Sequence, residues 1–298
     1  MVFDFNNLAS DIKKKNDKKE KIAIGALKYI AIKEAFAMSK EKNLPLYKNV
    51  LFRKYFTDFY RLTQGAFSTP AMQEVFYRLF QSVCELYNTK YNRCLNFKNI
   101  ETIISSVAGD KEKSFSSKIL HTLDNNSPII DSNVLKGLKL QSSPELYKDL
   151  CNEYLYGNKI KDIFANKLSQ TNSGGLIAIA KAEKWEDSFL ILCCKEYQRI
   201  IFASLKGISY SKQQKIRKVR NELVDIVKDI FKIHYLKTCT SAIDRLEKEI
   251  EIEKFFKENE FEKKVFDDKE NFGINIIKQL EDISLVKKID FYLWAYFA

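Results

Sequence analysis

The sequence predicts an all-α protein, and three observations support this fold class. Only 9 glycine and 4 proline residues occur in 298 positions, so the dense turns of a many-stranded sandwich or barrel are missing. Apolar residues make up 45% of the chain, which is enough for a globular core. These residues recur at spacings of three and four through most of the chain, the pattern of helices that bury one face.

The first hundred residues are expected to form core helices. Residues 22–39 and 70–90 carry apolar side chains at helical spacing. Between them, LFRKYFTDFYRL has the clearest amphipathic pattern, with aromatic side chains on one face: Phe52, Tyr55, Phe56, Phe59 and Tyr60. A stripe with helical period indicates a core face, and stacking on nucleic-acid bases is the alternative.

The later part of the chain predicts a long helical hairpin. Charged residues dominate from Ser211 to about Lys264, and apolar residues recur there at coiled-coil-like spacings: Val219, Leu223, Ile226 and Ile230, then Ile243, Leu246 and Ile250. A last core helix is expected near the C-terminus, with Ile283, Val286, Ile289, Tyr292 and Leu293 on one face.

The strongest break in the chain, QTNSGG at 170–175, divides this pattern. We expect a helical core domain at 1–169, a helical connection at 170–209, an inserted charged arm at 210–264 and C-terminal helices at 265–298 that complete the core.

The charge balance favours a polyanionic partner, with DNA as the favoured one. Fifty Lys and Arg residues against 39 Asp and Glu give a net charge of +11. The densest positive cluster beyond the N-terminus is SKQQKIRKVRNE, in which Lys215, Arg217, Lys218 and Arg220 are expected to contact phosphates. A solvated helix face is the alternative interpretation of this cluster.

Several classes of protein are not expected. The six cysteines are scattered and lack metal-ligand spacing, so we expect no metal site and free thiols. The chain has no Walker A or Gly-x-Gly-x-x-Gly motif, and no cofactor is expected. No apolar run approaches the ~20 residues of a membrane span, and the N-terminus does not read as a secretion signal. These patterns predict a cytoplasmic protein with no membrane partner and leave its oligomeric state open.

The stretch SFSSKILHTLDNNSPIIDSNVLKGL, at 114–138, carries the candidate chemistry. Its first ten residues predict a helix with Lys118 and His121 on one side, and Asn-Asn-Ser-Pro ends that helix. Asp131 then stands directly before a new short helix, where a carboxylate caps the free backbone N–H groups. The preceding Ile-Ile pair would hold this carboxylate at the edge of a dry pocket, where it can stabilise a developing cation.

The segment SPIIDSNVLKGL resembles the turn and helix start of the helix-hairpin-helix DNA glycosylase superfamily, whose P-x-x-D or P-V-D-x-x-V signature carries a catalytic aspartate. The resemblance implies that Asp131 stabilises an oxocarbenium-like sugar, or positions water, after the base has been flipped from the duplex. In bifunctional members a lysine about eighteen residues earlier forms a Schiff base with the sugar. Lys113 stands eighteen positions before Asp131, and Lys118 stands thirteen before it.

The wider pattern is similar to a bacterial group without an assigned function that shares SFxSKxLHT, PIxDSxVLxxL and KKIDFxLW. The superfamily's Leu-Pro-Gly-x-Gly hairpin does not occur before Lys113, where the sequence reads ISSVAGDKEKS. The C-terminal cysteine quartet of some members is also missing.

The resemblance therefore implies a multi-helix glycosylase-like fold and an N-glycosyl hydrolase that acts on DNA, with or without lyase activity, as in DNA repair. The expected catalytic residues are Asp131, Lys118 and Lys113, and the expected substrate-binding residues are His121, Ser132 and Asn133. One alternative is a non-catalytic helical module that binds nucleic acid or a protein, with Asp131 as a structural N-cap. Another is a defence protein that acts on modified phage DNA.

Overall fold

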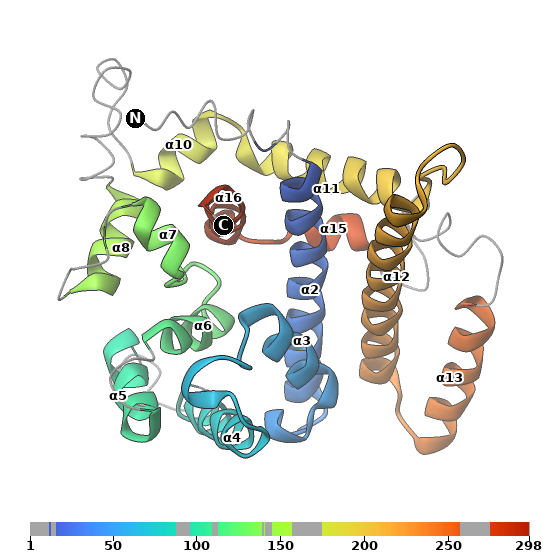
Figure 1. Cartoon of the computed structure of the whole chain (residues 1–298). Helices are drawn as coiled ribbons and strands as arrows, with labels where there is room; N and C mark the ends of the chain where they lie inside the picture. Colours follow the sequence, from blue (N-terminus) through green and yellow to red (C-terminus); the bar gives the residue numbers. More distant parts are fainter. Residues whose placement is uncertain are drawn as a thin grey trace. The chain divides into compact units, whose positions relative to one another are not determined.

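The structure is a computed structural model of the chain and describes residues 12, 16–87, 96–108, 113–138, 140, 145–156, 175–256 and 275–297 (Figure 1). These residues form thirteen α-helices and two short 3₁₀ helices and include no strand, so the all-α prediction is confirmed. Gly109 and, apart from Gly175, the break predicted at 170–175 lie outside the described residues.

The chain divides into two compact units, and neither is continuous in sequence. Unit 1 comprises Met1–Ile22, Thr63–Phe189 and Ile283–Ala298. Unit 2 comprises Ala23–Leu62 and Leu190–Asp282.

Unit 1 is a cluster of short helices around the C-terminal helix. Its elements are η2 (Gly65–Phe67), α4 (Pro70–Tyr87), α5 (Phe97–Ala108), α6 (Lys113–Leu123), α7 (Ser132–Gly137), α8 (Leu146–Leu155), α10 (Leu176–Ala182), the start of α11 (Trp185–Ile201) and α16 (Leu285–Phe297). α5 packs against α6, α10 packs against α8, and α16 packs against α7 and α10.

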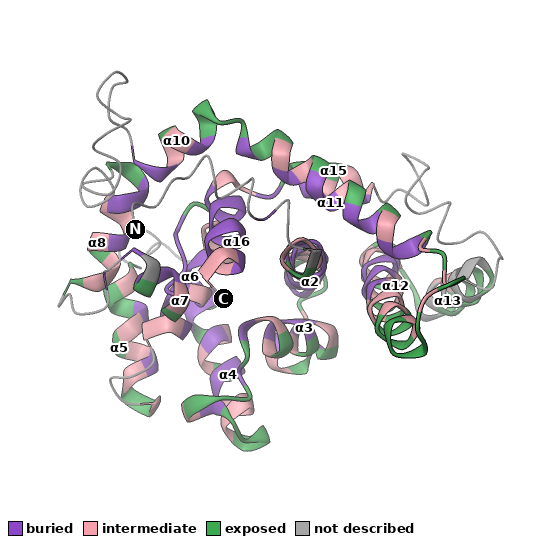
Figure 2. Cartoon of the chain, turned by 45° about the horizontal axis from the view of Figure 1, so that its top comes forward, coloured by how far each residue is buried: buried purple, intermediate pink, exposed green. Residues whose placement is uncertain are grey.

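Aromatic contacts hold these helices together. The rings of Phe67 and Phe76 each lie against the ring of Phe115, with centroids 5.6 and 5.7 Å away, and so join η2 and α4 to α6. On the other side of the unit, Trp185 at the start of α11 meets Tyr292 of α16 edge to face. α16 is largely buried along its length, as the purple ribbon in Figure 2 shows.

Unit 2 is built from longer helices. Its elements are most of α2 (Asn16–Glu41), η1 (Leu46–Lys48), α3 (Val50–Tyr60), the rest of α11, α12 (Tyr210–Thr238), α13 (Ala242–Phe256) and α15 (Ile276–Glu281). α3 starts at a buried Asn49, whose Oδ1 accepts the backbone N–H of Phe52 and whose Nδ2 donates to Ala35 O and Ser39 Oγ. The cap therefore also connects α3 to α2.

The aromatic stripe of α3 belongs to the core, as expected, because four of its five rings are buried: Phe52, Tyr55, Phe56 and Tyr60. Leu62 lies off the stripe and is nevertheless fully buried. Arg61 takes a left-handed conformation, with φ of 53°, which ends the helix and redirects the chain before Leu62.

The predicted helical hairpin is present as α12 and α13, which pack together. The apolar face of α12 is buried, and polar contacts connect this helix to α2 and α3, since Lys28 pairs with Glu222 and Tyr55 donates to Asp229. On α13, however, the apolar stripe is 71%, 61% and 69% exposed at Ile243, Leu246 and Ile250. The spacing therefore identified the helix, but these three side chains face solvent instead of a partner helix.

Candidate functional site

The turn between α6 and α7 is fastened to α6 by side-chain hydrogen bonds. Ser114 Oγ donates to the carbonyl of Ile130 (3.0 Å), and the N–H of Ile130 donates to Ser117 Oγ (2.9 Å). His121 Nδ1 lies 2.6 Å from the carbonyl of Ser127. A carbonyl oxygen can only accept, so Nδ1 carries the proton and donates. These bonds fix the backbone that leads into α7.

His121 is fully buried, so the structure places it inside unit 1 as a brace of this turn. Of the other residues expected to bind substrate, Ser132 is exposed and Asn133 is half-buried. Both belong to the first turn of α7, directly after Asp131.

Asp131 is the N-cap of α7, as the sequence predicts. Its Oδ1 accepts the backbone N–H groups of Asn133 (2.9 Å) and Val134 (3.2 Å). The residue is half-buried, so its carboxylate is neither sealed in the core nor fully solvated. The two hydrogen bonds fix the position of this carboxylate at the start of α7.

α16, which packs against α7, carries three charged side chains that are almost completely buried: Lys287, Lys288 and Asp290. Of these, Lys287 and Asp290 interact electrostatically with Asp131. Lys287 is 4% exposed and Asp290 is 6% exposed. Tyr154 of α8 donates its phenolic hydrogen to Asp290 Oδ1, and Ile129 adds a backbone hydrogen bond to the same side chain. Oδ2 of Asp290 has no hydrogen-bond partner among the described residues.

The charges of these residues are coupled. Burial raises the pKa of Asp290, while the charge of Lys287 and the bond from Tyr154 act in the opposite direction. Burial lowers the pKa of Lys287, and the carboxylates of Asp290 and Asp131 partly compensate. The negative charge of Asp131 also raises the pKa of Asp290. We call Asp131, Tyr154, Lys287 and Asp290 the α16 cluster.

The two lysines expected to act with Asp131 lie on α6. Lys113 Nζ is 3.5 Å from a carboxylate oxygen of Glu101 on α5. Lys118 Nζ lies over the ring of Phe115, 4.3 Å from its centroid. The lysine whose charge is coupled to Asp131 is instead Lys287.

Sequence reasoning missed Tyr154, Lys287 and Asp290. The signal for the last two was available, because ISLVKKIDFYLWAYFA is apolar on both sides of its charged residues. A helix with apolar residues on every face is buried on all sides. The few charged residues that it carries are then buried as well.

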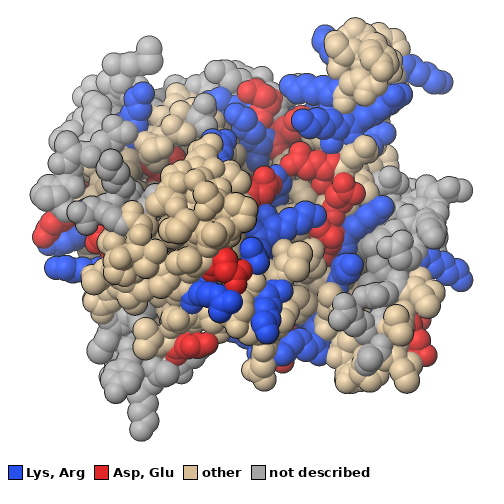
Figure 3. Space-filling view, turned by 60° about the horizontal axis from the view of Figure 1, so that its bottom comes forward, with Lys and Arg blue, Asp and Glu red and all other residues tan. Residues whose placement is uncertain are grey.

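The basic cluster of α12 belongs to unit 2. Lys215, Arg217 and Lys218 are exposed. Arg220 is half-buried, and its guanidinium donates to the carbonyls of Ile200 (3.1 Å) and Ala203 (2.9 Å). Arg220 therefore supports the end of α11, whereas the other three face solvent. In Figure 3, basic and acidic side chains are interspersed over the face that is shown.

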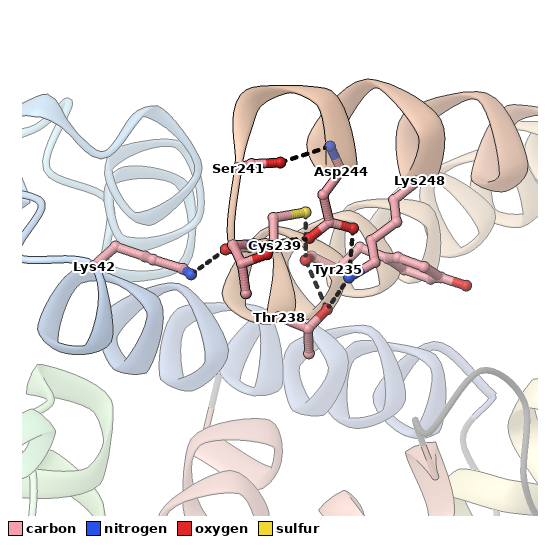
Figure 4. Close-up of polar contacts among 8 residues, drawn as sticks. Lys42, Tyr235, Thr238, Cys239, Ser241, Asp244 and Lys248 are labelled. Carbon is pink, nitrogen blue, oxygen red and sulfur yellow. Dashed lines mark hydrogen bonds and ion pairs between the residues drawn. The ribbon is translucent and has the colours of Figure 1, made fainter.

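A second polar cluster lies at the turn between α12 and α13 (Figure 4). Asp244 accepts the N–H of Thr240 (2.7 Å), forms an ion pair with Lys248 (3.1 Å) and donates its own N–H to Ser241 Oγ (3.1 Å). Lys42 of α2 donates to the carbonyl of Cys239 (2.6 Å). These contacts cap α13 and close the hairpin, which accounts for the cluster without a ligand.

Within the described part of the chain, no group of three or more His, Cys, Asp or Glu side chains is arranged to hold a metal ion. Among the same residues, no helix has both the length and the apolar character needed to cross a bilayer. Comparisons of the chain with protein-family models, with curated proteins and with solved structures found no match.

Proposed function

We propose that the protein acts on DNA and releases a base by N-glycosyl hydrolysis, with Asp131 as the reactive carboxylate. The observation that carries this proposal is that the half-buried Asp131 caps α7, and that the helix packed against α7, α16, holds the buried Lys287 and Asp290, which interact electrostatically with Asp131. A helix cap alone does not require a buried lysine and a second carboxylate that interact with it. Burial costs several kcal/mol per ion, and groups with perturbed pKa values concentrate at functional sites.

In the proposed reaction the bond between base and sugar breaks, its electron pair leaves with the base, and positive charge develops on the sugar. The ionised carboxylate of Asp131 stabilises this cation, and the N–H groups of Asn133 and Val134 hold the carboxylate in place. Water then adds to the sugar carbon and transfers a proton to a carboxylate of the cluster.

DNA as the partner is supported by charge and by resemblance. The net charge of +11 and the exposed Lys215, Arg217 and Lys218 favour a polyanion. The segment that precedes and caps α7 resembles the aspartate signature of DNA glycosylases. The alternative expectation, a defence protein that acts on modified phage DNA, would use the same partner.

The substitution Asp131→Asn tests the reaction, because asparagine caps a helix as well as aspartate does but carries no charge. We expect the variant to fold normally and to release base about 100-fold more slowly or worse from duplexes that contain modified bases. Asp187→Asn is the matched control, because Asp187 is an exposed carboxylate in the first turn of α11 in the same unit. The proposal is wrong if no modified duplex loses a base to the unaltered protein, or if Asp131→Asn is fully active.

A second candidate is a non-catalytic helical module that binds nucleic acid or a protein. This candidate is favoured by the two hydrogen bonds that Asp131 accepts from backbone N–H groups, because capping a helix is a structural role that requires no catalysis. For this candidate, Asp131→Ala lowers the free energy of unfolding by about 1 to 2 kcal/mol and leaves binding intact, with no base release by either protein.

A further inference from the structure

The corner between α11 and α12, in unit 2, is the most one-sided stretch of charge in the described chain. Residues 197–221 contain seven Lys or Arg residues and no Asp or Glu, although the whole chain has 39 acidic residues. This segment includes the end of α11, the loop drawn in gold in Figure 1 and the first turns of α12. The local field therefore favours a polyanion.

Most of these cations are available to a partner. Arg199 is paired with Glu196, and Arg220 is occupied by the carbonyls at the end of α11. The side chains of Lys206, Lys212 and Lys215 are exposed and have no ion-pair partner among the described residues. Arg217 and Lys218, further along α12, are exposed as well.

Two aromatic rings stand among these cations. Phe202, directly after α11, is 52% exposed, and Tyr210, the first residue of α12, is 73% exposed. Gly207 lies between them with φ of 76°, and a side chain built there would meet no atom within 4 Å. The loop surface is therefore open to solvent between the two rings.

Side chains of α12 hold the backbone of the corner in place by hydrogen bonds. Arg220 donates to the carbonyls of Ile200 and Ala203, on either side of Phe202. Gln213 Nε2 donates to the carbonyl of Ile208, two residues before Tyr210. Both ends of the loop are thus tied to the helix that follows it. A loop ordered in advance loses less conformational entropy when it binds.

We infer that this α11–α12 corner, formed by Phe202, Lys206, Tyr210, Lys212 and Lys215, binds single-stranded nucleic acid. The rings of Phe202 and Tyr210 stack on bases, and the lysines contact the phosphates. A single strand fits better than a duplex, because the bases of a duplex are already stacked on one another. A lipid surface fits less well, because the residues between Tyr210 and Lys215 are the polar Ser211, Lys212, Gln213 and Gln214 rather than an apolar face.

The inference shares its nucleic-acid partner with the proposed function but does not depend on the reaction at Asp131. Its test uses the full chain and the fluorescence anisotropy of labelled oligo(dT), with a duplex of the same length for comparison. We expect oligo(dT) to bind more tightly than the duplex. Tyr210→Ala should weaken oligo(dT) binding about tenfold or more, whereas Tyr210→Phe, which keeps the ring, should not. Tyr156→Ala is the control, because Tyr156 is an exposed tyrosine of unit 1.

The phosphate contacts are tested by salt dependence. Replacing Lys212 and Lys215 by glutamine should reduce the slope of log affinity against log salt by about 0.7 for each phosphate that is no longer neutralised. Replacing Lys98 and Lys181, two exposed lysines of unit 1, by glutamine removes the same total charge and should leave the slope unchanged. Equal slopes for the two double variants would show that the corner does not contact phosphates.

Three results overturn the inference: duplex binding as tight as oligo(dT) binding, an unchanged affinity in Tyr210→Ala, or binding only to phosphatidylserine vesicles. The reaction at Asp131 is judged separately. If no base is released but Tyr210→Ala still loses oligo(dT), the proposed reaction is wrong and the binding surface stands. If base is released and Tyr210→Ala binds normally, the reaction stands and this inference is wrong.

Discussion

The phenol of Tyr154 donates a hydrogen bond to Oδ1 of Asp290 and so joins α8 to α16 across 136 positions of the chain. Both side chains are almost completely buried. Burial and the negative charge of Asp290 raise the pKa of Tyr154, so the phenol stays protonated and remains a donor. The stability of unit 1 therefore depends on a neutral donor that faces a buried carboxyl group.

Removing this donor should destabilise the protein. Tyr154→Phe keeps the ring and leaves Asp290 Oδ1 without the phenol, so we expect the free energy of unfolding to fall by about 1 to 3 kcal/mol in urea titrations. Tyr156→Phe, two residues later and exposed, should change it by less than about 0.5 kcal/mol. Equal stability of the two variants would contradict the prediction.

The pH dependence of stability should report on Asp290. Burial raises its pKa from an ordinary value of 3.8 to about 7, so the folded chain binds this proton more tightly than the unfolded chain. The resulting stabilisation is complete below about pH 3.8 and is lost as pH rises through about 7. Lys287, whose pKa is lowered by burial, adds a separate pH dependence of stability at higher pH. The other ionisable side chains that act on Asp290 are Asp131 and Tyr154.

Asp290→Asn removes this titration. Between pH 4 and 7, we expect the free energy of unfolding of the variant to fall less steeply than that of the unaltered protein, by up to about 1.4 kcal/mol per pH unit. Chemical denaturation at a series of pH values measures the difference. Parallel profiles would show that Asp290 titrates normally in the folded chain.

We expect His121 to contribute to the stability of the fold and not to nucleic-acid binding. His121→Leu removes the donor to the Ser127 carbonyl, and we expect a loss of about 1 to 3 kcal/mol in the free energy of unfolding. Because the side chain is fully buried, nucleic-acid affinity should be unchanged at temperatures where the variant is folded. A fully stable variant with weakened binding would instead support the expected contact with substrate.

Gly175 should be intolerant of any side chain. A Cβ atom there would lie 2.5 Å from the carbonyl oxygen of Glu153 and 2.6 Å from that of Tyr154, and backbone atoms cannot move aside. Gly175→Ala should therefore separate α10 from the end of α8 and cost about 1 to 3 kcal/mol in thermal unfolding. Gly207→Ala provides the comparison, because it meets backbone strain without a clash and should cost only about 1 kcal/mol. A Gly175→Ala variant as stable as the unaltered protein would show that the two helices are not in tight contact.

Local patterns predicted the helices but not all of their packing. The spacing of Phe52, Tyr55 and Phe56 identified both a helix and its buried face. On α13 the same kind of spacing identified a helix whose stripe at Ile243 and Leu246 is exposed. Periodicity shows that a helix has an apolar face, but it does not show which other helix will cover that face.

The candidate site likewise has one part that the sequence predicts and one part that it does not. The N-cap at Asp131 could be predicted because a cap depends only on the next three residues. The contact between Tyr154 and Asp290 could not, because it joins residues far apart in the sequence. Lys287 was not singled out from the sequence, although its apolar neighbours there indicate burial.

The division of unit 1 into separated segments has a consequence for synthesis on the ribosome. Asp131 and Tyr154 are made before the whole of residues 190–282, which belong to unit 2, and Lys287 and Asp290 are made after them. A chain grows at about 5 to 20 residues per second, so the nascent protein spends seconds with the surfaces of α7 and α10 not yet covered by α16. The centre around Asp131 can thus form only after residues 190–282 have been made, and a nascent chain stalled within unit 2 would display an apolar surface that chaperones and proteases recognise.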